Sequence, residues 1–250
     1  MITICRLYKT LFLVVAGMIM LSACNGVYRN SPNLDFEKSG PAEIFKKGEL
    51  ELAKNRNERA AEYFGEIERL FPYSEWAKRG LIMQAFAYHK DRKYELSRGS
   101  ASRFIDFYPA DLDVAYAQYL VGLSYFDQIN DVGRDQGVTR SALEAFRVLF
   151  EEFPKSEYAE PAKLKFDLAF DHLASKEMEV GRYYLKGGHY SAAINRFRFV
   201  VEDFHTTSHT AEALHRLVEA YLSLGLTDEA QTAAAILGQK YDDSKWYQNS

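Results

Sequence analysis

One aromatic position recurs five times along this chain, each time at the end of a stretch with the same helical pattern. The five residues are Phe71, Tyr108, Phe153, Phe204 and Tyr241, and they stand 37, 45, 51 and 37 residues apart. Four, seven and eleven residues before each aromatic anchor, the side chain is apolar or small, and steps of four and three trace one face of an α-helix. Five helices of one design are therefore expected, each with its anchor buried in the core, and this restricts the fold to repeat architectures.

The segment after each of the first four anchors repeats as well. The third residue after the anchor is suited to start a helix, the ninth is small, and the seventeenth is aromatic. The first set is Ser74, Asp111, Ser156 and Thr207; the second is Gly80, Ala117, Ala162 and Ala213; the third is Tyr88, Tyr125, Phe170 and Tyr221. Small residues let antiparallel helices approach closely, and each hairpin can bury its apolar face only against the next.

The fold class that follows is all-α, a right-handed superhelical stack of about five tetratricopeptide-like helical hairpins. The first helix is expected within residues 41–54, and the domain within 41–250. Extra residues in 127–139 predict a longer loop, and the periodic stretch 173–186 predicts an extended or additional helix. No useful length of chain alternates with period two, so no sheet is expected.

The N-terminus has the layout of a targeting segment. Two cationic residues precede the apolar run 10–20, and small residues lead up to Cys24. Leu21-Ser22-Ala23-Cys24 resembles the bacterial lipobox, which implies a signal peptide at 1–23, an S-diacylglycerol and N-palmitoyl lipid at Cys24, and a flexible tether over 24–40. The alternative is an ordinary secretory signal with an incidental cysteine. Asn25 rather than aspartate follows the cysteine, which favours the outer membrane, with the protein facing the periplasm.

Composition excludes several classes of protein. The chain is 47% hydrophobic and 14% aromatic, enough for a large core and against disorder as the main state. Lys and Arg number 31 against 35 Asp and Glu, so no basic footprint predicts a nucleic-acid partner. Both cysteines fall within the first 24 residues, which excludes a disulfide framework or a cysteine zinc site in the body.

Catalytic motifs are absent from the sequence. It holds no glycine-rich phosphate loop, no Gly-x-Ser-x-Gly elbow and no His-Glu-x-x-His, so we expect no enzyme and no resident cofactor apart from the covalent lipid. His205 and His209, with His215 nearby, have a spacing that could suit a metal. They also fall at a predicted turn, and loop or surface histidines without a metal are the interpretation adopted.

A stack of hairpins offers a groove to peptides or partner domains, so binding is the function that the architecture favours. Phe71, Tyr73 and Trp76 at the first turn between hairpins are candidates for anchoring an apolar peptide end. The alternative is that these aromatic residues belong to the core.

Four local patterns, in this order along the chain, resemble the BamD family, the lipoprotein of the β-barrel assembly machinery. They are Pro72-Tyr73, Arg134-Asp135, Tyr183-Tyr184 and Asn195-Arg196. Two positions depart from the family pattern: His205 replaces a usual proline, and Glu58 replaces a basic residue of some members.

The resemblance implies a non-catalytic scaffold. C-terminal repeats, about 177–245, would bind the POTRA region of the barrel subunit, and N-terminal repeats, about 41–130, would receive unfolded outer-membrane protein substrates. Other assembly lipoproteins would be further partners. Asn195 and Arg196 are the candidate partner-binding residues, since Arg196 lies one position off the packed stripe and can reach outward. Its alternative role is a surface ion pair with Glu202 or a neighbouring carboxylate.

Two other readings remain open from the sequence. One is a different periplasmic repeat lipoprotein, an adaptor coordinating peptidoglycan synthesis with cell division. The other is a hydrolase of peptidoglycan or peptide, which no sequence feature supports.

Overall fold

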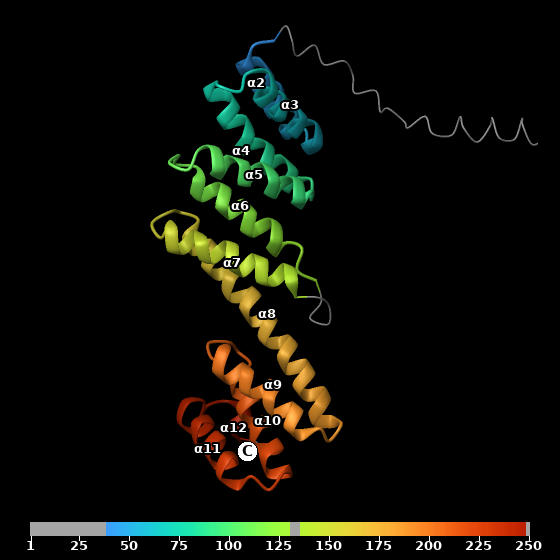
Figure 1. Cartoon of the computed structure of the whole chain (residues 1–250), viewed down its shortest axis with the longest axis vertical. Helices are drawn as coiled ribbons and strands as arrows, with labels where there is room; N and C mark the ends of the chain where they lie inside the picture. Colours follow the sequence, from blue (N-terminus) through green and yellow to red (C-terminus); the bar gives the residue numbers. More distant parts are fainter. Residues whose placement is uncertain (1–38, 131–135, 249–250) are drawn as a thin grey trace, which may run out of the picture. The chain divides into compact units, whose positions relative to one another are not determined.

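The computed structural model describes residues 39–130 and 136–248. The chain divides into two units, Met1–Gly40 and Pro41–Ser250, and the described helices belong to the second unit. They are, in order (Figure 1), α2 (Pro41–Ala53), α3 (Asn57–Leu70), α4 (Glu75–Lys90), α5 (Tyr94–Phe107), α6 (Val114–Phe126), α7 (Gly137–Glu152), α8 (Ala159–Lys186), α9 (Tyr190–Asp203), α10 (Thr210–Ser223), α11 (Thr227–Lys240) and α12 (Lys245–Gln248). The described ranges contain no strand.

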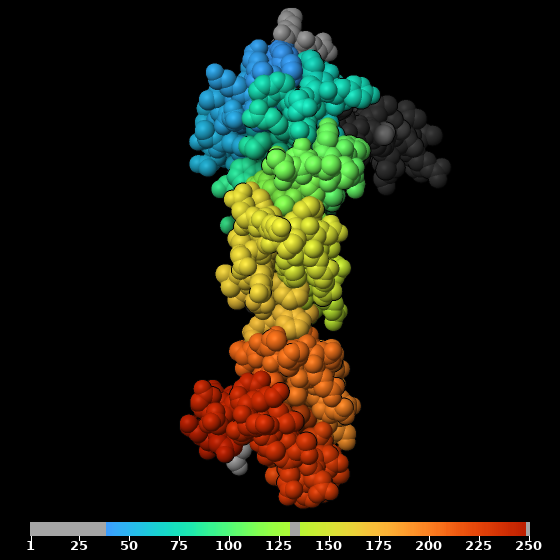
Figure 2. All heavy atoms as spheres, turned by 90° about the vertical axis from the view of Figure 1, so that its left-hand side faces the viewer, coloured from blue at the N-terminus to red at the C-terminus, as the bar shows by residue number. Residues whose placement is uncertain are grey.

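Each helix packs against the helices before and after it, so the chain forms the hairpins α2–α3, α4–α5, α6–α7, α8–α9 and α10–α11, followed by α12. The first helices of neighbouring hairpins also touch: α2 contacts α4, α4 contacts α6, and α6 contacts α8. The all-atom view shows consecutive hairpins in contact (Figure 2). The expected stack of about five tetratricopeptide-like hairpins is confirmed.

The same turn follows each aromatic anchor. The anchor's N–H donates to the carbonyl four residues back, at 2.8 Å for Phe71 and 3.0 Å for Phe204. The N–H three residues further on donates to the anchor's own carbonyl, at 3.0 Å in all five copies. Because the backbone repeats this geometry, the anchors mark equivalent helix ends, as the sequence pattern predicted.

Helix capping at these turns is less regular than expected. Ser74 caps α4, its Oγ accepting from the Ala77 N–H at 3.1 Å. Asp111, Ser156 and Thr207 cap no helix, since α6, α8 and α10 begin three residues later, after a further turn. The capping prediction was wrong at these three positions because the connection is longer there than before α4.

The predicted packed face is buried. All five residues four positions before the anchors are fully buried: Ile67, Phe104, Leu149, Val200 and Leu237. The anchors themselves were expected in the core, but only Phe204 is buried, and the other four are partly exposed. Each anchor is the residue that ends its helix, and the ring of Phe204 is covered by Phe170 and Phe199, whose ring centroids lie 4.7 Å and 5.4 Å away.

Helix α8 accounts for the extra length of the fourth unit. It runs for 28 residues without a break, so the prediction of an extended helix is confirmed and that of an additional one is not. Its N-terminal half packs on α7 and its C-terminal half on α9. The predicted turn follows at Gly187-Gly188, where Gly188 has φ +75°. Part of the predicted longer loop, residues 131–135, lies outside the described residues.

Candidate functional site

The predicted lipid site lies outside the described residues. Cys24, the signal peptide and most of the tether precede residue 39, and Arg134-Asp135 also fall outside the described ranges. The candidate surfaces in the structure therefore belong to the hairpins.

The three aromatic residues predicted to anchor a peptide are placed differently from one another. Trp76 is half-buried against Phe45, with ring centroids 5.2 Å apart. The guanidinium of Arg79 lies 4.9 Å from the centroids of both rings, so Trp76 belongs to a packed cluster. Phe71 ends α3 and is half-buried, whereas Tyr73 is fully exposed. Of the three side chains, only that of Tyr73 is free to meet a ligand.

Tyr73 lines a pocket of about 520 Å³ between two successive inter-hairpin turns. One wall comes from the turn between α3 and α4, and the other from the equivalent turn between α5 and α6. The lining residues are Pro72, Tyr73, Ser74, Glu75 and Lys78 on one side and Phe107, Tyr108, Pro109, Ala110 and Asp111 on the other. We call this the N-terminal pocket.

An ion-pair network crosses the N-terminal pocket. Lys78 Nζ lies 2.8 Å from Asp111 Oδ2 and 3.2 Å from Glu75 Oε2. Its hydrogen bond to Asp111 raises the pKa of Lys78 and lowers that of the Asp111 carboxyl, so both groups are held in their charged forms. The pocket thus combines exposed aromatic surface with fixed charges, which suits a peptide bearing an apolar side chain and a polar end.

Phe107 was not among the predicted site residues. It is the last residue of α5 and remains largely exposed although it is a large apolar residue. The available signal was its position: it directly precedes the anchor Tyr108 and so lies off the packed stripe. An aromatic residue on a solvent face has no core role to explain it.

The predicted partner-binding pair is on α9. Asn195 and Arg196 are both exposed. Arg196 Nη1 lies 2.9 Å from Oε2 of Glu177 on α8, and the side chains of the two residues are 45% and 16% exposed. Glu202, the alternative partner named from the sequence, pairs instead with Arg198 at 2.8 Å. Arg196 is therefore accessible and held in place by a carboxylate of the neighbouring helix.

The three histidines considered as metal ligands, His205, His209 and His215, each contact a different acidic residue or carbonyl group. His209 Nε2 is 3.3 Å from Asp171 Oδ2, and buried His215 has its Nε2 3.7 Å from Glu219 Oε1. His205 Nδ1 is 3.4 Å from the Glu202 carbonyl oxygen. Within the described residues, no group of three or more His, Cys, Asp or Glu side chains is arranged to hold a metal ion.

Two further observations concern membrane-spanning helices and the tyrosine pair Tyr183-Tyr184. No helix in the described ranges combines the length and the apolar character that crossing a membrane requires. Tyr183 of the tyrosine pair is exposed on α8, while Tyr184 packs against the C-terminal core.

Comparison with known proteins identifies the family of this chain. The family model "YfiO: Outer membrane lipoprotein" matches residues 37–236. The chain is similar to "Outer membrane protein assembly factor BamD" of Caulobacter vibrioides, at 43% identity over 227 residues, covering 91% of this chain and 74% of that protein. It is also similar to the protein of that name from Rickettsia prowazekii, at 43% identity over 206 residues, covering 82% of each.

The solved structures that match the chain include the TPR2AB domain:pHSP90 complex of yeast Sti1, with a TM-score of 0.44 and 13% identity, covering 83% of this chain and 80% of that one. Another is PilW, a type IV pilus biogenesis factor, with a TM-score of 0.38 and 13% identity, covering 84% of this chain and 97% of that one.

Proposed function

The chain belongs to the YfiO family of outer membrane lipoproteins, to which the BamD assembly factors are related, and on this premise we propose that it is a lipid-anchored scaffold of outer-membrane protein assembly. Its C-terminal repeats bind the periplasmic POTRA region of a barrel subunit, and its N-terminal repeats receive unfolded outer-membrane proteins. The observation that carries this proposal is the 43% identity to two BamD assembly factors over most of the chain.

The protein acts through contact surfaces and is not an enzyme. The relatives are named as assembly factors, and the described part of the chain is a stack of helical hairpins, an architecture that presents surfaces to partners. In the proposed function the chain holds a substrate near the barrel subunit, so it needs a separate binding surface for each of these two proteins.

The N-terminal pocket supports a role in receiving substrate. Tyr73 and Phe107 offer exposed aromatic surface on opposite walls. An aromatic side chain of a peptide would bury its ring against these walls. In this proposal Tyr73 acts together with Phe107, rather than with Phe71 and Trp76.

The α8–α9 hairpin supports a role in partner binding. Arg196 is exposed, yet its ion pair with Glu177 limits its freedom before any partner arrives. A side chain ordered in advance loses less entropy on binding, so the pair is suited to an interface. Asn195, next to it on the same exposed part of α9, adds an amide that can donate and accept.

Co-isolation from outer membranes tests the proposal. The full-length chain, purified with its lipid anchor in mild detergent, should bring down a large β-barrel protein in stoichiometric amount. Recovery of a peptidoglycan synthase without the barrel protein would instead support an adaptor of cell-wall synthesis and would refute the proposal.

Membrane attachment is tested separately with Cys24→Ala. The variant should accumulate as a soluble or unprocessed precursor, because the acyl chains supply the membrane affinity. Retention of a correctly cleaved variant in the outer membrane would show that the cysteine is not the anchor.

A further inference from the structure

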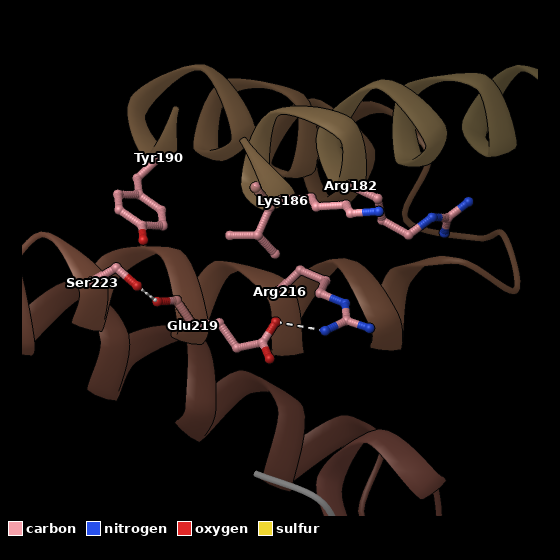
Figure 3. Close-up of a pocket in the computed structure, with 7 residues that line it drawn as sticks. Arg182, Lys186, Tyr190, Arg216, Glu219 and Ser223 are labelled. Atoms are coloured by element: carbon pink, nitrogen blue, oxygen red, sulfur yellow. Dashed lines mark hydrogen bonds and ion pairs between the residues drawn. The ribbon is translucent and has the colours of Figure 1, made fainter. Parts of the chain in front are cut away.

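A groove of about 430 Å³ lies between α8 and α10, the first helices of the last two hairpins (Figure 3). Arg182, Leu185 and Lys186 face it from α8, and Tyr190 faces it from the start of α9. The α10 side contributes Arg216, Glu219 and Ser223. We call this the α8–α10 groove.

Positive charge is in excess in the α8–α10 groove. Arg182 Nη1 lies 3.1 Å from Glu212 Oε1, and Arg216 Nη1 lies 2.7 Å from Glu219 Oε2. Arg216 Nε is also 3.6 Å from Glu212 Oε1. Lys186 makes no ion pair with any described residue, so the three cations of the groove face only two carboxylates. The excess contrasts with the whole chain, whose net charge is −4.

The three cations lie where one acidic segment can reach them. Arg182 and Lys186 are four residues apart on α8 and therefore project from the same face, about 6 Å apart along the axis. Arg216 is fixed on the opposite wall, because its guanidinium lies 5.2 Å from the ring centroid of Trp246 on α12. Its Nε is buried and has no hydrogen-bond partner in the described part of the chain, which leaves a donor unsatisfied.

Apolar surface accompanies the charges. Leu185 lines the groove from the same helix as Arg182 and Lys186, and Figure 3 shows the Tyr190 ring above the end of the groove near Ser223. A protein segment can place the hydrocarbon part of a glutamate against Leu185 and Tyr190 while its carboxylate meets the cations. A free inorganic anion would make no use of this apolar wall.

We propose that the α8–α10 groove binds an acidic segment of a partner protein, with Lys186, Arg182 and Arg216 receiving its carboxylates. The proposal rests on the proposed function, since α8 and α10 lie in the repeats assigned to the partner. It adds a second contact to the one at Arg196. Glu177, which holds Arg196, precedes Arg182 by five residues, so the two sites lie about 140° apart around α8.

A peptide-binding measurement tests the groove directly. The full-length chain in detergent is titrated against a fluorescein-labelled glutamate-rich peptide and against its glutamine counterpart, with anisotropy as the readout. The glutamate peptide should bind about tenfold more tightly, and its affinity should fall as salt is added.

Lys186→Glu is the diagnostic variant, because this side chain has no ion partner to lose among the described residues. It should weaken binding of the glutamate peptide about tenfold, whereas Lys186→Arg should restore it. Lys163→Glu is the matched control: it makes the same charge change on an exposed position of the same helix, outside the groove, and should leave the affinity within about twofold. Equal affinity for both peptides, or equal losses in the two glutamate variants, would overturn the proposal.

A parallel titration against the periplasmic domains of the barrel subunit separates this proposal from the proposed function. Weaker binding of Lys186→Glu, with unchanged binding of Lys163→Glu, supports both. Full affinity of Lys186→Glu for these domains overturns the groove as the partner's contact and leaves the proposed function intact. If the wild-type chain does not bind the domains, the proposed function fails, and the peptide titration alone decides whether the groove binds acidic segments.

Discussion

The ring of Phe197 on α9 fills the space that a side chain on Gly181 of α8 would need. Gly181 and Phe197 are sixteen residues apart, and a pair with the same separation occurs in the first hairpin. There a Cβ on Gly48 would lie 2.6 Å from Cε1 of Phe64. In the second hairpin the equivalent pair is Ala85 and Ala101, both fully buried. In the first and fourth hairpins a phenylalanine on one helix thus faces a glycine on the other, and in the second hairpin both equivalent residues are alanine.

Gly181→Ala should therefore destabilise the protein by about 1–3 kcal/mol, because the added methyl group must displace the Phe197 ring in a packed core. Gly99→Ala is the matched control, since Gly99 is an exposed position of α5 where a Cβ would have no atom within 4 Å. This change should stabilise by about 0.5–1 kcal/mol through helix propensity. Chemical denaturation measures both, and equal effects of the two substitutions would contradict the packing argument.

Phe197→Ala should cost about 3–5 kcal/mol, since the fully buried ring leaves a cavity. The double variant with Gly181→Ala gives a sharper result. Once the ring is gone, the methyl group at position 181 enters vacant space, so it should cost nothing further or recover part of the loss. Additive losses in this double-mutant cycle would show that the two residues do not compete for one volume.

Arg92→Gly should stabilise the protein by about 0.5–1 kcal/mol. Asn55, Arg92, Gly188 and Gly225 all precede an anchor by sixteen residues and all have positive φ, with Arg92 at 59°. A non-glycine residue pays about 1–2 kcal/mol in this region, partly offset by the greater freedom of glycine in the unfolded chain. Arg92→Ala removes the same exposed side chain but keeps the Cβ and should gain little. The melting temperatures of the two variants provide the comparison, and a larger gain for alanine would contradict the explanation by strain.

Stability should fall at alkaline pH because of Tyr116. Burial, and next the neighbouring Tyr158 and Tyr119, raises the pKa of Tyr116 from 10.0 to about 12. The folded state therefore holds this proton more tightly than the unfolded state, so the stability it contributes is present below pH 10 and is lost as the pH rises toward 12. Tyr116→Phe should reduce this loss. Urea midpoints measured across that range give the comparison, and parallel pH profiles of wild type and variant would count against it.

Helical periodicity was enough to predict the hairpins, because the burial of residues such as Ile67 and Leu149 follows from the spacing of apolar residues within their own helix. The sites depend on relations between repeats. Tyr73 and Phe107 line one pocket from turns that belong to two different hairpins, and nothing near either residue in the sequence indicates the other. Trp76 could not be separated from Tyr73 by residue type, since its burial depends on Phe45 and Arg79. Similarly, the α8–α10 groove exists only because α8 continues past residue 173 as one helix.

Arg196→Ala should weaken binding of the barrel subunit's periplasmic domains by about 2–5 kcal/mol if the guanidinium is buried against a partner carboxylate. A role confined to the exposed pair with Glu177 would cost under about 1 kcal/mol, and in folding stability rather than in affinity. Arg198→Ala is the matched control, because it removes the same side chain two residues along α9 and breaks an exposed pair with Glu202 at 2.8 Å. Glu177→Gln completes the set, since it breaks the same ion pair from the other side and leaves the arginine present. We expect Arg196→Ala to lose affinity while the other two variants stay within about fivefold of the wild type. Equal affinities of the two arginine variants would mean that Arg196 only links α9 to α8 through its ion pair with Glu177 and does not bind the partner.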